Sequence, residues 1–238
     1  MKVVFFSDIH ANLPALESFF KDIELIKPDA IYCLGDLVGY NIWANEVVDE
    51  IRKRQIPTIM GNHDEALLKP RIIKDRPSNK RLTRALVSEK NRDYLINLPR
   101  HLSLSFADGD EFFNVLMVHG SVKAINDYMV EDYPEKEVLE MMEQHKTDVL
   151  LCGHTHKPFH RIIKSENKVK HIVNVGSVGK PKDGDVRGCY AVVDFNQASI
   201  SDIKVTFRRV EYDIEKAAKA IEESEFDNAL AVALRLAK

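Results

Sequence analysis

The chain has 238 residues, a length that suits one large domain or two small ones. Its formal net charge is -3, with acidic and basic residues mixed along the sequence, so it shows no cationic footprint for duplex nucleic acid. No apolar run approaches the ~20 residues that a membrane-spanning helix needs. The apolar start, MKVVFFSDIH, is too short for a signal peptide and predicts the first strand of a cytoplasmic protein.

The three cysteines, Cys33, Cys152 and Cys189, include no closely spaced pair. This spacing argues against both a disulfide framework and a zinc finger. We interpret them as small buried thiols in a reducing compartment.

The first part of the chain alternates between predicted strands and helices. Apolar runs rich in β-branched and aromatic residues predict strands over Lys2–Phe6, Ala30–Leu34 and Thr58–Met60. The apolar positions of Leu13–Ile26 share one helical face, with Asn12 as N-cap and Pro14 in the first turn. A second helix is expected over Ala44–Arg54. Strands and helices in this order predict a parallel sheet with helical crossovers.

The remainder of the chain divides into a helical stretch, a strand-rich part and a helical tail. The stretch at about 65–99 is basic and helical in pattern, and a further helix is expected over Pro134–His145. Strands are expected over Leu102–Phe106, Phe112–Val118, Val149–Cys152, Phe159–Ile163, Val169–Val175, Cys189–Phe195 and Ile203–Val210. A helical tail is expected over Ile214–Lys238. No internal repeat or linker-like composition interrupts the sequence, which favours a single domain over residues 1–238 with a helical excursion at about 65–99.

Five of the apolar runs end in polar side chains that can bind metals. These residues are Asp8 and His10, then Asp36, then Asn62, His63 and Asp64, then His119, and finally His154 and His156. In open α/β sheets the loops beyond the carboxyl ends of the strands meet at one crevice. A lone histidine after a strand is more often structural, but so many donor atoms in one place would repel one another or stay unsatisfied without cations.

The types of side chain indicate which metals would bind. Imidazole, carboxylate and amide groups without a thiolate suit Mn, Fe, Zn, Co or Ni, whereas calcium prefers mostly oxygen ligands. A carboxylate can bridge two cations ~3.5–4 Å apart, which is the spacing used in two-metal hydrolysis of phosphoesters. We therefore expect two divalent ions, with manganese favoured.

The motifs at the strand ends resemble those of a known family. In order, Asp8-Ile9-His10, Gly35-Asp36, Gly61-Asn62-His63-Asp64, Val118-His119-Gly120 and Gly153-His154-Thr155-His156 resemble the five motif blocks of the calcineurin-like metallophosphoesterases. The later segment Asn174–Gly179 is similar to a loop of the small prokaryotic phosphodiesterase branch. Ala11 stands where that family usually has Gly, and Val175 where it usually has Pro. Neither position supplies a ligand side chain, so these departures concern the shape of the loops.

This resemblance implies a fold and a role for each residue. The fold would be a four-layer α/β/β/α sandwich, with two facing mixed β-sheets and helices outside. One metal would be held by Asp8, His10 and His156, the other by Asn62, His119 and His154, with Asp36 as the bridge. His63 would face the scissile phosphate, oriented by Asp64. A metal-activated hydroxide would attack phosphorus while His63 protonates or stabilises the leaving alkoxide.

The function favoured at this stage is a binuclear metal-dependent phosphodiesterase acting on a small or nucleotide-like phosphoester. A protein Ser/Thr phosphatase or a diadenosine tetraphosphatase of the same fold is the first alternative. It is less favoured because no Arg adjoins the early motif blocks, and Arg187 is the late candidate. A non-catalytic metal-binding scaffold is the second alternative, and the presence of His63 beside a full ligand set argues against it. The physiological substrate and the oligomeric state stay open.

Several neighbouring residues are candidates for contacts with substrate. Lys180, Lys182 and Arg187 flank the late loop and are either steering groups for an anion or a solvated basic face. Tyr40 is either a stacking platform for a base or part of the core. Because the excursion leaves directly from Asn62-His63-Asp64, we expect it to line the substrate entrance and to influence selectivity.

Overall fold

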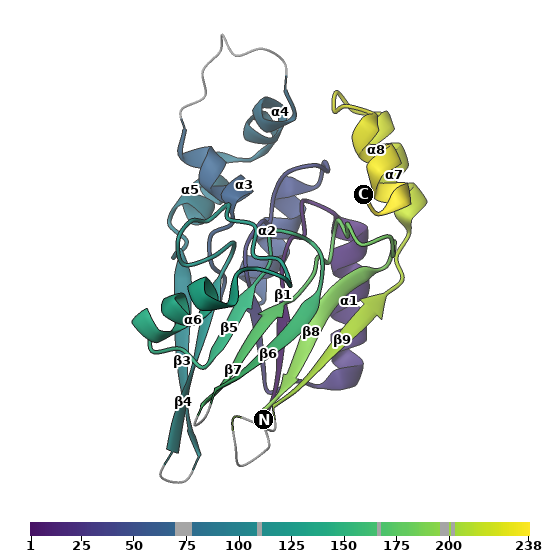
Figure 1. Cartoon of the computed structure of the whole chain (residues 1–238). Coiled ribbons are helices and arrows are strands. Elements are labelled where there is room, and N and C mark those ends of the chain that lie inside the picture. Colours follow the sequence, from purple (N-terminus) through teal and green to yellow (C-terminus); the bar gives the residue numbers. More distant parts are fainter. Residues whose placement is uncertain (70–77, 109–110, 166–167, 196–199, 201–202) are drawn as a thin grey trace.

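Two β-sheets face each other in the middle of the molecule (Figure 1). The computed structural model describes residues 1–69, 78–108, 111–165, 168–195, 200 and 203–238. The first sheet has the order β2-β1-β8-β9 and contains β1 (Lys2–Phe6), β2 (Ala30–Cys33), β8 (Gly188–Asp194) and β9 (Lys204–Val210). The second sheet has the order β3-β4-β5-β7-β6 and contains β3 (His101–Asp108), β4 (Glu111–Val118), β5 (Val149–Cys152), β6 (Phe159–Ser165) and β7 (Lys168–Asn174).

Both sheets mix parallel and antiparallel neighbours. In the first, β1 pairs with β2 in parallel and with β8 in antiparallel orientation. In the second, β4, β5 and β7 run parallel, and antiparallel hairpins flank them. The strand expected over Thr58–Met60 is wrong: this segment forms one parallel bridge, from Thr58 to Cys33. The amide of Met60 donates to the carbonyl of Pro99 instead, so the chain turns away from β2.

Helices cover the outer faces of the sheets and confirm the four-layer sandwich. On the first sheet lie α1 (Leu13–Ile26) and α2 (Ala44–Lys53), and on the second lies α6 (Glu135–Gln144). The start of α1 is as predicted, because the Asn12 side chain accepts a hydrogen bond from the amide of Ala15 at 3.2 Å.

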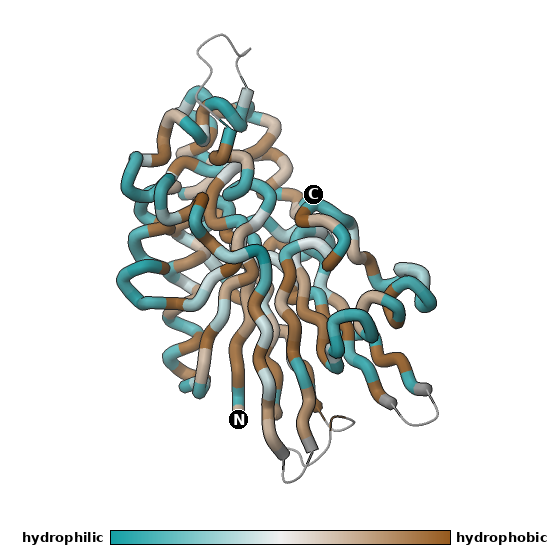
Figure 2. Tube along the Cα trace, turned by 90° about the vertical axis from the view of Figure 1, so that its left-hand side faces the viewer, coloured by the Kyte–Doolittle hydropathy of each residue, from teal (hydrophilic) through white to brown (hydrophobic). Residues whose placement is uncertain are grey.

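The apolar periodicity of each element decides which layer it contacts. Along β1, Val4 and Phe6 pack with Phe19 of α1, while Val3 and Phe5 belong to the core between the sheets. Strand segments accordingly appear mostly brown in Figure 2. Each side chain of this size that is fully buried contributes about 1.5–3 kcal/mol.

The excursion is helical, as expected, and lies at the top of Figure 1. It contains α3 (Asn62–Glu65), the 3-10 helix η1 (Ala66–Leu68), α4 (Asn79–Leu86) and α5 (Glu89–Ile96), whereas residues 70–77 lie outside the described part. The Asn45 side chain on α2 donates to the carbonyl of Leu86 at 2.8 Å. The Asn79 side chain accepts from the amide of Asp227 at 3.3 Å. These contacts hold α4 between α2 and the C-terminal helices.

The C-terminal tail is two helices rather than one continuous helix. It contains α7 (Ile214–Glu222) and α8 (Ala229–Leu236). The break follows from local capping, because the Asp227 carboxylate accepts from the amide of Ala229 at 2.9 Å. The two helices pack together around Ile221 and Leu234. Among the described helices, none is long and apolar enough to cross a membrane.

Candidate metal centre

The polar residues at the strand ends come together along the edge that the two sheets share. Asp8 and His10 follow β1, and Asp36 follows β2, both in the first sheet. The histidines at positions 119, 154 and 156 follow β4 and β5 in the second sheet. The crevice expected at the edge of one open sheet is therefore built by two sheets, and Asn62 reaches it from the start of α3.

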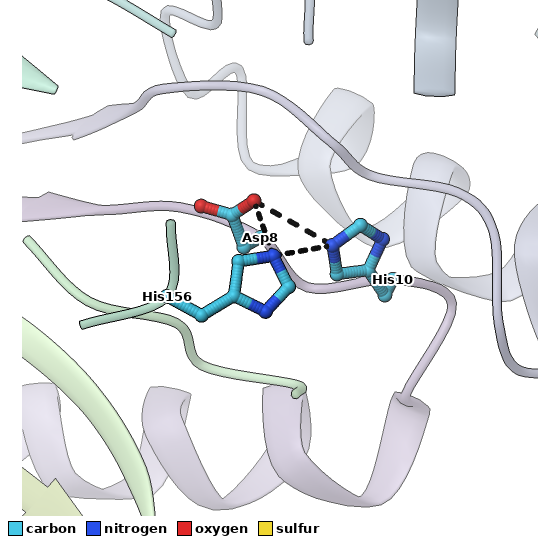
Figure 3. A group of neighbouring side chains, drawn as sticks. All are labelled: Asp8, His10 and His156. Carbon is cyan, nitrogen blue, oxygen red and sulfur yellow. Dashed lines mark hydrogen bonds and ion pairs between the residues drawn. The ribbon is translucent and has the colours of Figure 1, made fainter. Parts of the chain in front are cut away.

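One cluster contains Asp8, His10 and His156, whose ligand atoms all lie within 4.8 Å of one another (Figure 3). The Nε2 atom of His156 lies 3.0 Å from Oδ1 of Asp8, and that of His10 lies 3.5 Å from the same oxygen. The two Nε2 atoms are 3.1 Å apart. All three side chains are buried.

A second cluster contains Asp36, His119 and His154. The Nε2 atom of His119 lies 3.3 Å from Oδ2 of Asp36 and 3.2 Å from Oδ1 of Asn62. The same Asp36 oxygen lies 3.6 Å from Nε2 of His10, which belongs to the first cluster. Asp36 thus stands between the clusters, where a bridging carboxylate would have to be.

Backbone carbonyls fix the orientation of three of the imidazoles. The Nδ1 atoms of His10, His119 and His156 face the carbonyl oxygens of Val38 at 3.1 Å, Leu34 at 2.7 Å and Lys180 at 2.5 Å, respectively. A carbonyl only accepts, so each Nδ1 carries a proton, and in the neutral ring each Nε2 presents a lone pair to the cluster. This is the arrangement in which histidine binds a metal.

The resulting set of acceptor atoms fits divalent cations. The Nε2 atoms of His10 and His156 face each other as two acceptors, and so do Nε2 of His119 and Oδ1 of Asn62. Among the described residues, buried Nε2 of His154 and Oδ1 of Asp8 have no hydrogen-bond partner. Such groups are costly to bury unless something binds them.

The electrostatics of the protein chain favour charged carboxylates in this place. Burial raises the pKa of Asp8, but the neighbouring His156 and His119 bring it well below its ordinary value. Burial also opposes the charge of His119, yet attraction by Asp36 and Asp8 raises its pKa to about 10. Burial lowers the pKa of His10 to about 3. Asp8 is therefore anionic and His10 neutral, as metal ligands must be, whereas His119 would give up its Nε2 proton when a cation binds.

A cavity of about 430 Å³ opens over the two clusters. Its lining residues are Asp36, Tyr40, Asn62, His63, Ser78, Asn79, Lys80, Thr83, Tyr128, His154, His156 and Lys182. Four of these residues, Ser78, Asn79, Lys80 and Thr83, lie at and beside the start of α4. Helix α4 therefore forms one side of this cavity.

Comparison with known proteins decides the family. The family model described as the calcineurin-like phosphoesterase superfamily domain matches residues 1–198. The chain belongs to the calcineurin-like phosphoesterase superfamily. The uncharacterised protein MJ0912 of Methanocaldococcus jannaschii is 31% identical over 232 residues, covering 90% of this chain and 89% of its own length.

Solved structures agree with this assignment. The crystal structure of a metallophosphoesterase from Sphaerobacter thermophilus aligns with a TM-score of 0.79 and 28% identity, covering 100% of both chains. The hypothetical protein PH1004 from Pyrococcus horikoshii OT3 aligns with a TM-score of 0.81 over 98% of this chain and 97% of its own, and at 22% identity it supports the fold alone. The family and the acceptor clusters together make this protein a metal-dependent phosphoesterase.

The metallophosphoesterase holds five of its seven predicted ligands in an unusual backbone conformation. Positive φ angles occur at Asp8 (56°), His10 (51°), Asp36 (55°), His154 (62°) and His156 (61°). Ala11 also has a positive φ, 53°, which explains why the family usually has Gly there. Each non-glycine residue in this region costs about 1–3 kcal/mol, and such strain persists where the surrounding structure enforces it, commonly at active sites.

The late loop over Asn174–Gly179 helps to hold the strained ligand loops in place. The Ser177 hydroxyl donates to the carbonyl of Asp8 at 2.7 Å, and the amide of Gly179 donates to the same carbonyl at 3.0 Å. The Asn174 side chain donates to the carbonyl of Gly153 at 2.6 Å. The sequence marked this loop only as a family feature, whereas the structure shows that it supports two ligand-bearing loops.

Asp64 has a different partner from the one implied by the family resemblance. Its carboxylate accepts hydrogen bonds from the amides of Asp36 at 2.8 Å, Gly61 at 3.0 Å and Leu37 at 3.1 Å. Within the described residues no bond joins it to the ring of His63. Burial and the nearby charge of Asp36 raise the pKa of Asp64 to about 7. Asp64 therefore holds the loop that carries the expected bridge, because its oxygens satisfy the amides of that loop.

His63 is positioned by Tyr40 and Gly39, which the sequence did not connect with it. The ring centroid of His63 lies 4.7 Å from that of Tyr40 and 4.9 Å from that of His10. A Cβ atom at Gly39 would lie 2.5 Å from Nδ1 of His63, so only glycine leaves room for the ring. Burial lowers the pKa of His63, although Asp36 opposes the shift. His63 also forms a third cluster with His10 and Asp36, so its role as a non-ligand stays a prediction.

Only some of the candidate substrate contacts named from the sequence line the cavity. Lys182 lines it, with its Nζ 5.9 Å from the ring centroid of Tyr40. Lys180 donates from Nζ to the carbonyl of Lys238 at 2.8 Å, and Arg187 pairs with Asp185 away from the cavity. Tyr128, which no sequence pattern marked, is 62% exposed and lies with its ring 4.7 Å from that of His154.

The histidines outside the motif blocks stay outside the clusters. His160 and His171 stack on each other at 5.2 Å, and His101 and His145 are exposed. Cys33, Cys152 and Cys189 are free and buried, as expected.

Proposed function

We propose that this metallophosphoesterase is a phosphodiesterase with two divalent metal ions, acting on small or nucleotide-like phosphoesters. The observation that carries the proposal is the pair of acceptor clusters on either side of Asp36. Asp8, His10 and His156 would hold one ion, and Asn62, His119 and His154 the other, with Asp36 shared. Bound ions, with manganese as the first candidate, would neutralise phosphoryl oxygens and lower the pKa of a water.

His63 is the proposed proton donor to the leaving group. It lines the cavity beside the clusters, and Gly39 and Tyr40 hold its ring in place. Hydrolysis adds water across one P–O ester bond, so the departing alkoxide needs a proton or a positive charge nearby. An imidazole within reach supplies either one. A scaffold that only bound metals would use a histidine in this position solely as a further ligand.

The composition of the cavity supports a diester as substrate. The cations among its described lining residues are Lys80 and Lys182, and no arginine is among them. A dianionic monoester is bound best by the two parallel hydrogen bonds of a guanidinium, which this lining does not supply. A diester carries one negative charge and has less need of such a clamp.

The test uses protein shown by elemental analysis to be metal-free. We expect no hydrolysis of bis(p-nitrophenyl) phosphate before manganese, cobalt or nickel is added, and activity afterwards. Calcium serves as a control, because imidazole ligands suit it poorly. The value of kcat/KM should be higher for this diester than for p-nitrophenyl phosphate. Full activity of the metal-free protein would contradict metal dependence, and a clear preference for the monoester would favour a phosphatase.

A further inference from the structure

The cavity over the metal centre continues into a second recess of about 430 Å³. Asn62 and Lys80 line both spaces, so the recess begins beside a predicted metal ligand. Its other lining residues are Glu65, Ala66, Leu68, Lys69, Arg84 and Asn126. The recess therefore lies between η1, α4 and the loop that follows β4. A substrate anchored at the metals can extend into it without leaving the protein surface.

The recess is positively charged. Lys69, Lys80 and Arg84 line it, and its one acidic residue, Glu65, is paired with Arg100. The Arg84 side chain is fixed to the wall, because its Nε donates to the carbonyl of Ala66 at 3.2 Å. Within the described part of the chain, the ammonium groups of Lys69 and Lys80 have no hydrogen bond or ion pair. These groups are available to an anion.

We propose that this recess binds a second phosphate of the substrate, while the scissile diester lies at the metal centre. The substrate class is then a nucleotide-like phosphodiester that carries an additional phosphate on the part extending past α4. The proposal rests on the proposed function, whose site it extends. Lysine ammonium groups are common protein ligands of phosphate, and their charge suits a dianion better than a neutral sugar or base.

The test compares two esters that differ in one phosphate. Thymidine 5′-(p-nitrophenyl phosphate) lacks the second group, and its 3′-phosphorylated counterpart carries it. With manganese-loaded protein, we expect the 3′-phosphate to raise kcat/KM about tenfold, mainly through KM, as charge-assisted hydrogen bonds do. The Lys69→Ala/Lys80→Ala double variant should lose most of this gain. Lys80→Arg should keep it, and so should Lys90→Ala, which changes an exposed lysine of α5.

Two results would overturn the inference. One is equal kcat/KM for the two esters, and the other is a gain that survives in the double variant. Hydrolysis of neither ester would contradict the proposed function instead. In that case the inference is decided by calorimetric binding of thymidine 3′,5′-bisphosphate and thymidine 5′-monophosphate to the metal-loaded protein. Binding of the bisphosphate that is about tenfold tighter, with the difference lost in the double variant, would support a phosphate site in the recess. Equal binding of the two compounds would refute that site.

Discussion

The floor and the wall of the cavity are built in opposite ways. The floor consists of the predicted ligands Asp8, His10, Asp36, Asn62, His119, His154 and His156. The wall consists of Ser78, Asn79, Lys80, Thr83, Tyr128 and Lys182. Most floor side chains are buried, and three of the imidazoles are fixed by backbone carbonyls. In the wall, Tyr128 is 62% exposed, and the Lys80 side chain has no partner within the described residues.

This contrast indicates where chemistry and selectivity reside. Groups that stabilise a transition state must be held in place before substrate binds, which a buried and strained floor achieves. Groups that only contact the substrate can be substituted without disturbing the metal site, because they lie in the exposed wall. Substitutions in the floor should therefore abolish activity, and those in the wall should change relative rates.

The largest effect is expected from Asp36→Asn. Because Asp36 lies between the clusters, this variant should lose both ions and all measurable hydrolysis. His10→Ala should mainly empty one site. Metal content by elemental analysis measures both outcomes, and His145→Ala, which changes an exposed histidine, is the control. Normal occupancy of one site in Asp36→Asn would count against a bridge.

His63→Ala should lower catalytic activity without lowering the metal content. The variant should keep both ions, while kcat falls by ~10²–10⁴, the usual contribution of a positioned acid or base. The fall in kcat should be smaller for esters of p-nitrophenol than for esters of poor leaving groups, because p-nitrophenolate needs little protonation. An equal loss for both kinds of ester would refute the acid role. Loss of an ion would assign His63 to the floor as a ligand, as its cluster with His10 and Asp36 permits.

Asp64→Asn tests whether Asp64 stabilises the loop that carries Asp36 or orients the ring of His63. Replacing one oxygen by an amide nitrogen would leave buried backbone amides without an acceptor. The free energy of unfolding of the metal-free protein should fall by about 1–3 kcal/mol, as measured by denaturant titration. Asp93→Asn, on the exposed side of α5, should leave it unchanged. An altered dependence on leaving group with unchanged stability would restore the expected role of Asp64 beside His63.

The smallest effect is expected from Tyr128→Ala in the wall. Loss of a stacking platform should raise KM for nucleoside esters roughly fivefold to tenfold, at the low end of what base stacking contributes. Methyl p-nitrophenyl phosphate, which has no base, should be less affected, and Tyr128→Phe should behave like the native protein. A fall in metal content would show instead that Tyr128 supports His154.

Much of the floor could be predicted because its information is local. Each ligand except Asn62 follows an apolar run that forms a strand, so the position of the residue along the chain fixes its place at the sheet edge. The capping of α1 by Asn12 is equally local. The same reasoning was wrong for Thr58–Met60, where the amide of Met60 turns to Pro99 in place of a strand neighbour. It also missed the break between α7 and α8.

The sequence by itself therefore determined the family, the layers and the residues expected at the metals, because strand length and motif spacing are read within a few neighbouring positions. Only the tertiary structure decided how Asp64 bonds, how Gly39 makes room for His63, and which side chains form the wall. Lys80 and Tyr128 lie on separate segments and follow no periodic pattern. They share one cavity because α4 is held between α2 and the C-terminal helices, through contacts between residues far apart in the chain.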